Sequence, residues 1–180
     1  MPGTNLANAL VSHSFHPDIP KDQRIFEPLI GSWSLVVRWF DEAGNLTRKE
    51  AGEWHFAPVL EGRGVQDVWI VPPRGKRGSD DYEYGTSIRF YDATIGGWRS
   101  TWIGPIRGAV VTFIARKTGD RIVLETTPDM PIARRWVFCD ITESDFRWIN
   151  EEQGDRGWRV VQTFEARRVQ QAWGSDQPKR

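Results

Sequence analysis

Apolar and polar residues alternate along most of this chain, with a period of two from Trp33 onward. A period of two sends successive side chains to opposite faces of an extended strand, whereas a helical face repeats every 3.6 residues. The alternation predicts ten strands, over residues 33–40, 48–57, 62–71, 85–91, 97–103, 108–116, 121–127, 133–140, 144–151 and 157–168.

The connections between these strands are short and rich in Gly, Asn and Asp, as in Asp41-Glu42-Ala43-Gly44-Asn45 and Lys117-Thr118-Gly119-Asp120. Such residues form tight turns, and the exception is the loop from Pro72 to Tyr84, which is long for a hairpin. The sequence therefore predicts an all-β fold: an antiparallel up-and-down β-barrel of about eight to ten strands, closed so that no strand edge is exposed. A sandwich of two sheets is the alternative.

The residues outside this pattern set the expected domain limits. Residues 1–21 lack periodicity and are interpreted as a flexible arm, residues 22–170 as a single barrel domain, and residues 171–180 as a flexible tail. Within the barrel domain, Asp22 is placed to cap a short helix that ends near Leu29 and closes one end of the barrel. Pro28 limits the length of this plug helix.

Two segments give the chain a family likeness. Gly31-Ser32-Trp33 opens the first long strand, and Thr163-Phe164-Glu165-Ala166-Arg167-Arg168 forms the last. Both segments resemble those of the calycin superfamily, which includes the lipocalins and fatty-acid-binding proteins. The resemblance implies a calycin-like barrel in which Arg167 or Arg168 packs on Trp33 through a cation–π contact.

A nearer resemblance is to uncharacterised bacterial lipocalin-like proteins from families of unknown function. It extends over residues 25–168 and includes Glu53-Trp54-His55-Phe56, Arg89-Phe90-Tyr91-Asp92 and Trp98-Arg99-Ser100-Thr101-Trp102. Those families often have an Asp-Gly-Gly-x-x-Trp hairpin near the end, of which Gly154-Asp155-Arg156-Gly157-Trp158 keeps only a part. The resemblance implies a fold and carries over no catalytic residue.

Composition narrows the possible partners. Lys+Arg and Asp+Glu both number 24, so no net field favours nucleic acid or an anionic membrane. No stretch approaches the roughly 18 apolar residues of a membrane span, and no signal peptide is recognisable. With Cys139 as the single cysteine, an intrachain disulfide is impossible, and we expect a cytoplasmic protein.

Ten tryptophans are the strongest functional signal, since large flat side chains fill a barrel core or line a pocket. The first hypothesis is a protein that binds a small apolar or aromatic ligand inside the barrel. We expect Trp54, Trp69, Trp102 and Trp148 to contact this ligand, and Arg89 or Arg147 to hold an anionic group on it.

The second hypothesis is a cofactor-independent isomerase, cyclase or hydrolase acting on a small hydrophobic substrate. Glu53 and His55 share one face of a strand, and Asp67 follows on the next, so a carboxylate beside an imidazole would supply acid or base. This requires their side chains to face the barrel interior. Because Trp54 and Phe56 alternate with them, the interpretation as solvent-facing residues stays open.

No cofactor or metal is predicted. The sequence has no phosphate-binding Gly-rich loop before a helix, no Cys pair for zinc and no Gly-x-Ser-x-Gly motif. A third hypothesis is an interaction domain that forms a homodimer through an exposed patch of tryptophans.

Overall fold

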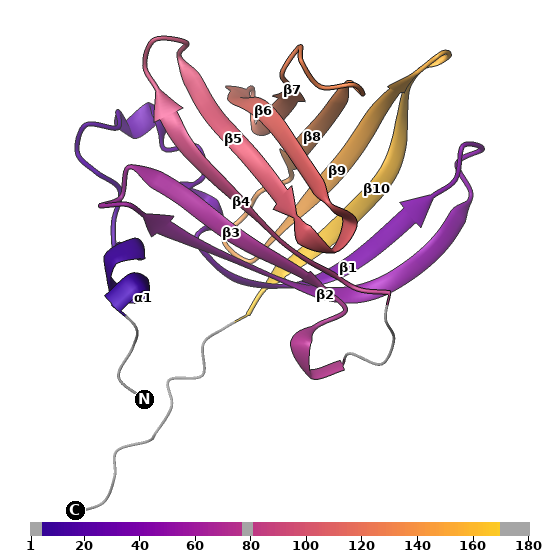
Figure 1. Cartoon of the computed structure of the whole chain (residues 1–180), viewed down its shortest axis with the longest axis horizontal. Coiled ribbons are helices and arrows are strands. Elements are labelled where there is room, and N and C mark those ends of the chain that lie inside the picture. Colours follow the sequence, from indigo (N-terminus) through magenta and orange to yellow (C-terminus); the bar gives the residue numbers. More distant parts are fainter. Residues whose placement is uncertain (1–4, 77–80, 170–180) are drawn as a thin grey trace, which may run out of the picture.

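The computed structural model describes residues 5–76 and 81–169, and Figure 1 shows ten strands wrapping into one closed wall. The strands are β1 (Gly31–Phe40), β2 (Leu46–Val59), β3 (Gly64–Val71), β4 (Glu83–Asp92), β5 (Gly97–Gly104), β6 (Ala109–Thr118), β7 (Arg121–Thr126), β8 (Arg134–Cys139), β9 (Asp145–Gly154) and β10 (Gly157–Arg168). Each coincides with a predicted strand to within a few residues at either end. The all-β prediction is therefore confirmed.

All the strands pair antiparallel with their neighbours in sequence, and β1 also pairs with β10 to close the barrel. Across this closure Trp33 lies opposite Arg168, and on its other side it lies opposite Trp54. The closed up-and-down barrel is the arrangement that the turn spacing predicts, and it leaves no unpaired strand edge.

The two ends of the barrel differ. The turns after β1, β3, β5, β7 and β9 surround one end, here called the open end. The chain enters β1 and leaves β10 at the other end, which the segment before β1 covers, and which is here called the closed end. That segment contains helix α1 (Asn5–Leu10) and the 3₁₀ turns η1 (Lys21–Gln23) and η2 (Glu27–Leu29).

Apolar side chains fill the closed end. Phe26 and Leu29 have no exposed surface, and Trp33 donates its indole N–H to the Leu29 carbonyl at 2.8 Å. The guanidinium of Arg168 lies 4.1 Å from the Trp33 ring centroid and also donates to the carbonyls of Ile30 and Pro28. The expected cation–π contact on Trp33 is thus confirmed, with Arg168 as its cation.

The plug differs from the single helix that we expected. It consists of η1 and η2, and Asp22 makes no capping hydrogen bond. Pro28 sits in the first turn of η2, where its missing N–H breaks no hydrogen bond. The plug segment is short, so it forms two single 3₁₀ turns in place of one longer helix.

The N-terminal segment packs more closely than its composition indicates. Val11 forms a β-bridge with Val59, and Phe15 and Ile19 are buried against the barrel. Two apolar side chains of the predicted arm, Phe15 and Ile19, therefore belong to the buried core. The predicted tail, 171–180, lies outside the described residues.

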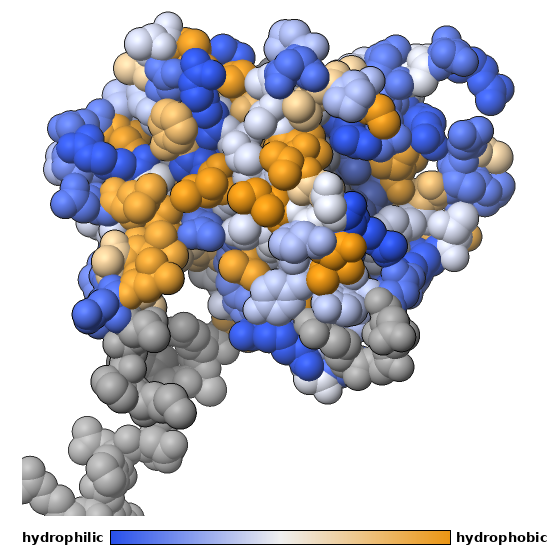
Figure 2. Space-filling model, viewed as in Figure 1, coloured by the Kyte–Doolittle hydropathy of each residue, from blue (hydrophilic) through white to orange (hydrophobic). Residues whose placement is uncertain are grey.

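The outer wall carries exposed apolar side chains on β4, β5 and β6, and Figure 2 shows such residues on the visible face. Phe90, Ile103 and Val110 are the largest examples, with Ile106 beside them in the turn η4 (Pro105–Arg107). The homodimer stays a prediction. Among the described helices, none combines the length and hydropathy needed to cross a membrane.

Candidate ligand-binding cavity

A cavity of about 260 Å³ opens at the open end of the barrel. Because a water molecule takes up about 30 Å³ of liquid, the space holds roughly nine waters or one small organic molecule. Its walls are mainly aromatic, and the aromatic side chains that line it are Trp39, Trp54, Trp69, Trp102, Trp136, Trp148 and Phe164.

The strand register brings these rings together. Trp54 lies opposite Trp69 on neighbouring strands, and Phe164 lies opposite Trp148. Gly85 makes room for a further ring, because a Cβ atom there would meet the indole of Trp102. Inward positions of seven strands therefore supply the aromatic wall, and a glycine on an eighth leaves room for one of the indoles.

The rings hold each other in fixed positions. Trp148 stacks on Phe164 with their centroids 4.2 Å apart and an interplanar angle of 15°, and Trp69 stacks on Phe164 at 5.4 Å and 16°. Trp102 meets Trp136 edge to face at 6.1 Å. Such contacts favour a wall that keeps its shape, which suits the binding of a flat molecule.

Charged side chains surround the mouth of the cavity in pairs. Arg107 donates to Glu83 at 2.7 Å, and Arg134 donates to Glu152 at 2.9 Å. The hydrogen bond that Arg107 donates to Glu83 raises the pKa of the Arg107 guanidinium above its ordinary value. The rim cations therefore already have carboxylate partners, and the mouth carries no unpaired charge from these four residues.

Within the cavity wall, three indole N–H groups have no such partner. Trp54, Trp69 and Trp148 are 5%, 6% and 3% exposed, and their Nε1 atoms make no hydrogen bond to the described residues. Trp136 differs, because its Nε1 donates to Asn150 Oδ1 at 3.1 Å. Buried indole N–H groups usually find an acceptor, so three without one in a single wall are unusual.

A buried ion pair lies deeper in the barrel. Arg89 donates from Nη2 to Asp67 Oδ2 at 2.5 Å, and both side chains are no more than 1% exposed. The Ser87 backbone N–H also donates to Asp67, and the Arg89 guanidinium lies 4.7 Å from the Phe26 ring centroid. Nε and Nη1 of Arg89 and Oγ of Ser100 find no partner among the described residues.

The structure brings together four of the predicted ligand contacts, Trp54, Trp69, Trp102 and Trp148, in the cavity wall. It separates the two predicted arginines from them. Arg89 lies inside the barrel but does not line the cavity, and it is paired with Asp67. Arg147 points outward, where its side chain is 60% exposed and pairs with Asp140 at 3.2 Å.

Glu53 and His55 lie on the outer wall, separated from Asp67 by the sheet, because Trp54 and Phe56 take the inward positions. His55 contacts Glu53 Oε2 at 3.0 Å through Nε2 and Ser32 Oγ at 2.9 Å through Nδ1. The Arg74 side chain binds Glu53, and this hydrogen bond lowers the pKa of the Glu53 carboxyl to about 2. The three acid–base candidates therefore do not form one site inside the cavity.

Several lining residues were missing from the sequence prediction: Trp39, Trp136, Asn150, Gln162 and Phe164. Alternation identifies three of them, since Trp39 shares its face with Trp33, Trp136 with Phe138, and Phe164 with Ala166. Alternation also places Asn150 on the face of Trp148 and Gln162 on that of Phe164, but an amide gives no apolar signal that marks its position as inward.

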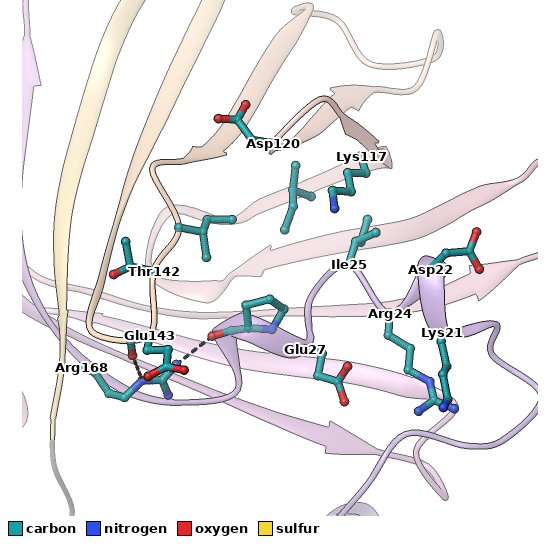
Figure 3. A pocket seen from close by; sticks show the side chains of 13 residues that line it. Lys21, Asp22, Arg24, Ile25, Glu27, Lys117, Asp120, Thr142, Glu143 and Arg168 are labelled. Atoms are coloured by element: carbon teal, nitrogen blue, oxygen red, sulfur yellow. Dashed lines mark hydrogen bonds between the residues drawn. The ribbon is translucent and has the colours of Figure 1, made fainter.

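A larger hollow of about 910 Å³ lies outside the barrel at the closed end, between the plug and the turns after β6 and β8 (Figure 3). Its walls carry exposed side chains of both signs, including Lys21, Glu27, Lys117 and Asp120. Arg168 at its edge is held by backbone carbonyls. None of the unpartnered buried polar atoms of the described residues lines it, so the aromatic cavity is the better candidate.

The described residues contain no group of three or more His, Cys, Asp or Glu side chains placed to hold a metal ion.

No protein-family model matches the sequence, and no curated protein matches it significantly. Among solved structures, the chain is similar to the S-type phycobiliprotein lyase CPES from Guillardia theta, with a TM-score of 0.56 and 12% identity. That similarity covers 82% of this chain and 92% of the other. A protein of unknown function of the DUF3598 family from Nostoc punctiforme aligns over 83% of this chain and 100% of its own, at 10% identity and a TM-score of 0.27.

At 12% identity the lyase comparison shows a shared fold and nothing of the chemistry. A closed antiparallel barrel of ten strands fits the calycin-like fold that the sequence resembles, while no family match confirms that family.

Proposed function

We propose that this protein binds one small, flat, largely apolar molecule inside its barrel. The observation that carries the proposal is the convergence of six tryptophans and one phenylalanine on a cavity of about 260 Å³ with an open mouth. Binding sites for small molecules are concave and mainly apolar, with a few placed polar groups, and this cavity has that composition. The fold shared with a barrel-shaped neighbour supports ligand binding in general.

The wall geometry indicates a planar ligand. Ring contacts such as that between Trp148 and Phe164 hold the aromatic wall in place, and a rigid aromatic wall favours a flat ring system as its ligand. The paired charges at the mouth leave the interior neutral, so burial of apolar surface supplies most of the expected affinity.

The test is equilibrium dialysis of the two-ring probe 2-acetylnaphthalene against the protein and two variants. Trp102→Ala removes one cavity wall, and we expect it to weaken binding about tenfold, which corresponds to about 1.4 kcal/mol. Trp158→Ala is the matched control, because Trp158 is exposed and packs under Arg135 outside the cavity lining. Near-UV circular dichroism checks that both variants fold.

Equal loss in the two variants, or no loss in folded Trp102→Ala, would show that the probe binds elsewhere. Native mass spectrometry of protein isolated from its own source gives an independent check. A co-purified mass of a few hundred daltons that Trp102→Ala fails to retain supports the proposal.

A further inference from the structure

The unpartnered polar atoms of this protein are confined to one place. In the described part of the chain, every buried side-chain nitrogen or oxygen without a hydrogen-bond partner lies inside the barrel. These are Nε1 of Trp54, Trp69 and Trp148, Nε and Nη1 of Arg89, and Oγ of Ser100. Five of the six atoms are donors only, and the sixth is a hydroxyl, so the unpartnered buried atoms of the interior are donors that meet no acceptor.

The shortage is specific to the cavity and does not come from tryptophan chemistry in general. At the closed end, Trp33 donates to the Leu29 carbonyl and Trp98 donates to the Gln23 carbonyl, each at 2.8 Å. The three unpartnered indoles all line the cavity. Neighbouring ring faces are weak acceptors, worth less than a carbonyl oxygen, so they do not meet the need.

The charges around these donors restrict the acceptor further. Each cation at the cavity mouth has a carboxylate partner, Arg107 with Glu83 and Arg134 with Glu152, and Arg89, deeper in the barrel, is paired with Asp67. A buried carboxylate would have no unpaired cation to offset its desolvation, whereas a neutral carbonyl oxygen needs only the indole donors.

We infer that the natural ligand is a neutral planar ring compound that carries a carbonyl oxygen, such as an aryl ketone, a quinone or a lactam, and that this oxygen accepts hydrogen bonds from the indole donors of Trp54, Trp69 and Trp148, at most two of them at once. The inference rests on the proposed function. It adds the chemical class of the ligand and gives the three indoles a role as polar contacts as well as apolar walls.

The experiment compares three probes of nearly equal shape in equilibrium dialysis at pH 7. 2-Acetylnaphthalene carries a carbonyl, 2-isopropenylnaphthalene replaces that oxygen by a CH₂ group, and 2-naphthoate carries a charge. We expect the ketone to bind about fivefold more tightly than the alkene, the gain of one net hydrogen bond, and more tightly than the carboxylate.

Variants then locate the contact. Trp148→Phe and Trp69→Phe keep a ring and remove the indole N–H, and we expect each to reduce the preference for the ketone over the alkene. Trp136→Phe is the matched control, because its indole N–H already binds Asn150 and its loss leaves that preference unchanged. The ratio of the two affinities is the readout, so a general loosening of the cavity does not imitate the effect.

Each outcome has a distinct meaning. Equal binding of ketone and alkene by the parent protein overturns the carbonyl inference and leaves the proposed function standing. Tightest binding of the carboxylate overturns the neutral class. Failure of all three probes to bind overturns the proposed function and the inference with it. If one Trp→Phe variant does not fold, the comparison of the probes in the parent protein and in the other variant still tests the inference.

Discussion

The two ends of the barrel use the same residue type in opposite ways. At the closed end, Trp33 and Trp98 are fully buried, and the indole N–H of each reaches a backbone carbonyl of the plug. Around the cavity at the open end, Trp54, Trp69 and Trp148 are nearly as buried, yet their N–H groups reach no acceptor among the described residues.

This difference separates two roles that burial alone does not distinguish. A tryptophan whose ring is buried and whose N–H has an acceptor stabilises the fold, because removing it costs both packing and a hydrogen bond. A buried tryptophan whose N–H has no acceptor lowers the stability of the fold. Such a cost is common where a ligand completes the site. We therefore expect substitutions at the closed end to reduce stability and those around the cavity to reduce binding.

The largest expected effect concerns the ion pair between the two ends. Arg89→Met leaves Asp67 buried without its cation, and we expect the free energy of unfolding to fall by about 3–5 kcal/mol. Urea unfolding measures it. The double variant Asp67→Leu/Arg89→Met removes both charges and should regain much of the loss. A single variant as stable as the parent would mean that the pair is solvated.

At the closed end, Trp98→Phe removes the donor to the Gln23 carbonyl and part of a buried ring. We expect a loss of about 2 kcal/mol in the free energy of unfolding, from the lost hydrogen bond and the small cavity left behind. Urea unfolding again measures the change, while dialysis of 2-acetylnaphthalene should show little change in affinity. A strong loss of binding with full stability would reverse the contrast between the ends.

Around the cavity, Trp148→Phe removes an N–H that has no partner and keeps a ring beside Phe164. We expect the free energy of unfolding to change by less than about 1 kcal/mol, because no hydrogen bond is lost. Thermal unfolding of the free protein measures it beside Trp98→Phe. Equal destabilisation by the two substitutions would remove the distinction between the indoles.

The smallest expected effect on stability concerns an ion pair on the outer wall, which serves as a reference for both ends of the barrel. Arg74 lowers the pKa of Glu53 from its ordinary 4.5 to about 2, so the folded state favours the charged carboxylate. This stability is present above pH 4.5 and is lost as the pH falls toward 2. Because Arg74 is largely exposed, we expect less than about 1 kcal/mol.

Glu53→Gln should remove that part of the acid dependence, measured by urea unfolding at pH 6 and pH 3, without changing probe binding. A change in probe affinity would connect the outer wall to the cavity, contrary to the arrangement described above.

The fold was predictable because strand alternation and turn residues are local signals. The same alternation places Arg147 outward, since it stands between inward Phe146 and Trp148, so its proposed role conflicted with that of its neighbour. By contrast, local sequence patterns do not reveal which residues of different strands meet inside the barrel. Strand register brings Arg89 from β4 into contact with Asp67 on β3, while Arg63, which is nearer to Asp67 in the sequence, pairs with Asp18.

The segment before the plug illustrates a second limit of sequence reasoning. Phe15 and Ile19 give no periodic signal, yet both are buried against the barrel. Likewise, the missing acceptors around Trp54, Trp69 and Trp148 become visible only when every neighbouring group is placed.

The closure of β1 on β10 also has a consequence for biosynthesis. Ser34 and Arg167 face each other across this seam although they are 133 positions apart in the chain. On the ribosome, β1 therefore emerges with one edge unpaired and waits until almost the whole domain has been made. A nascent chain that stalls before β10 exposes an unpaired strand edge, which is a template for pairing with another chain. Timely synthesis of the last strand therefore protects this barrel from aggregation.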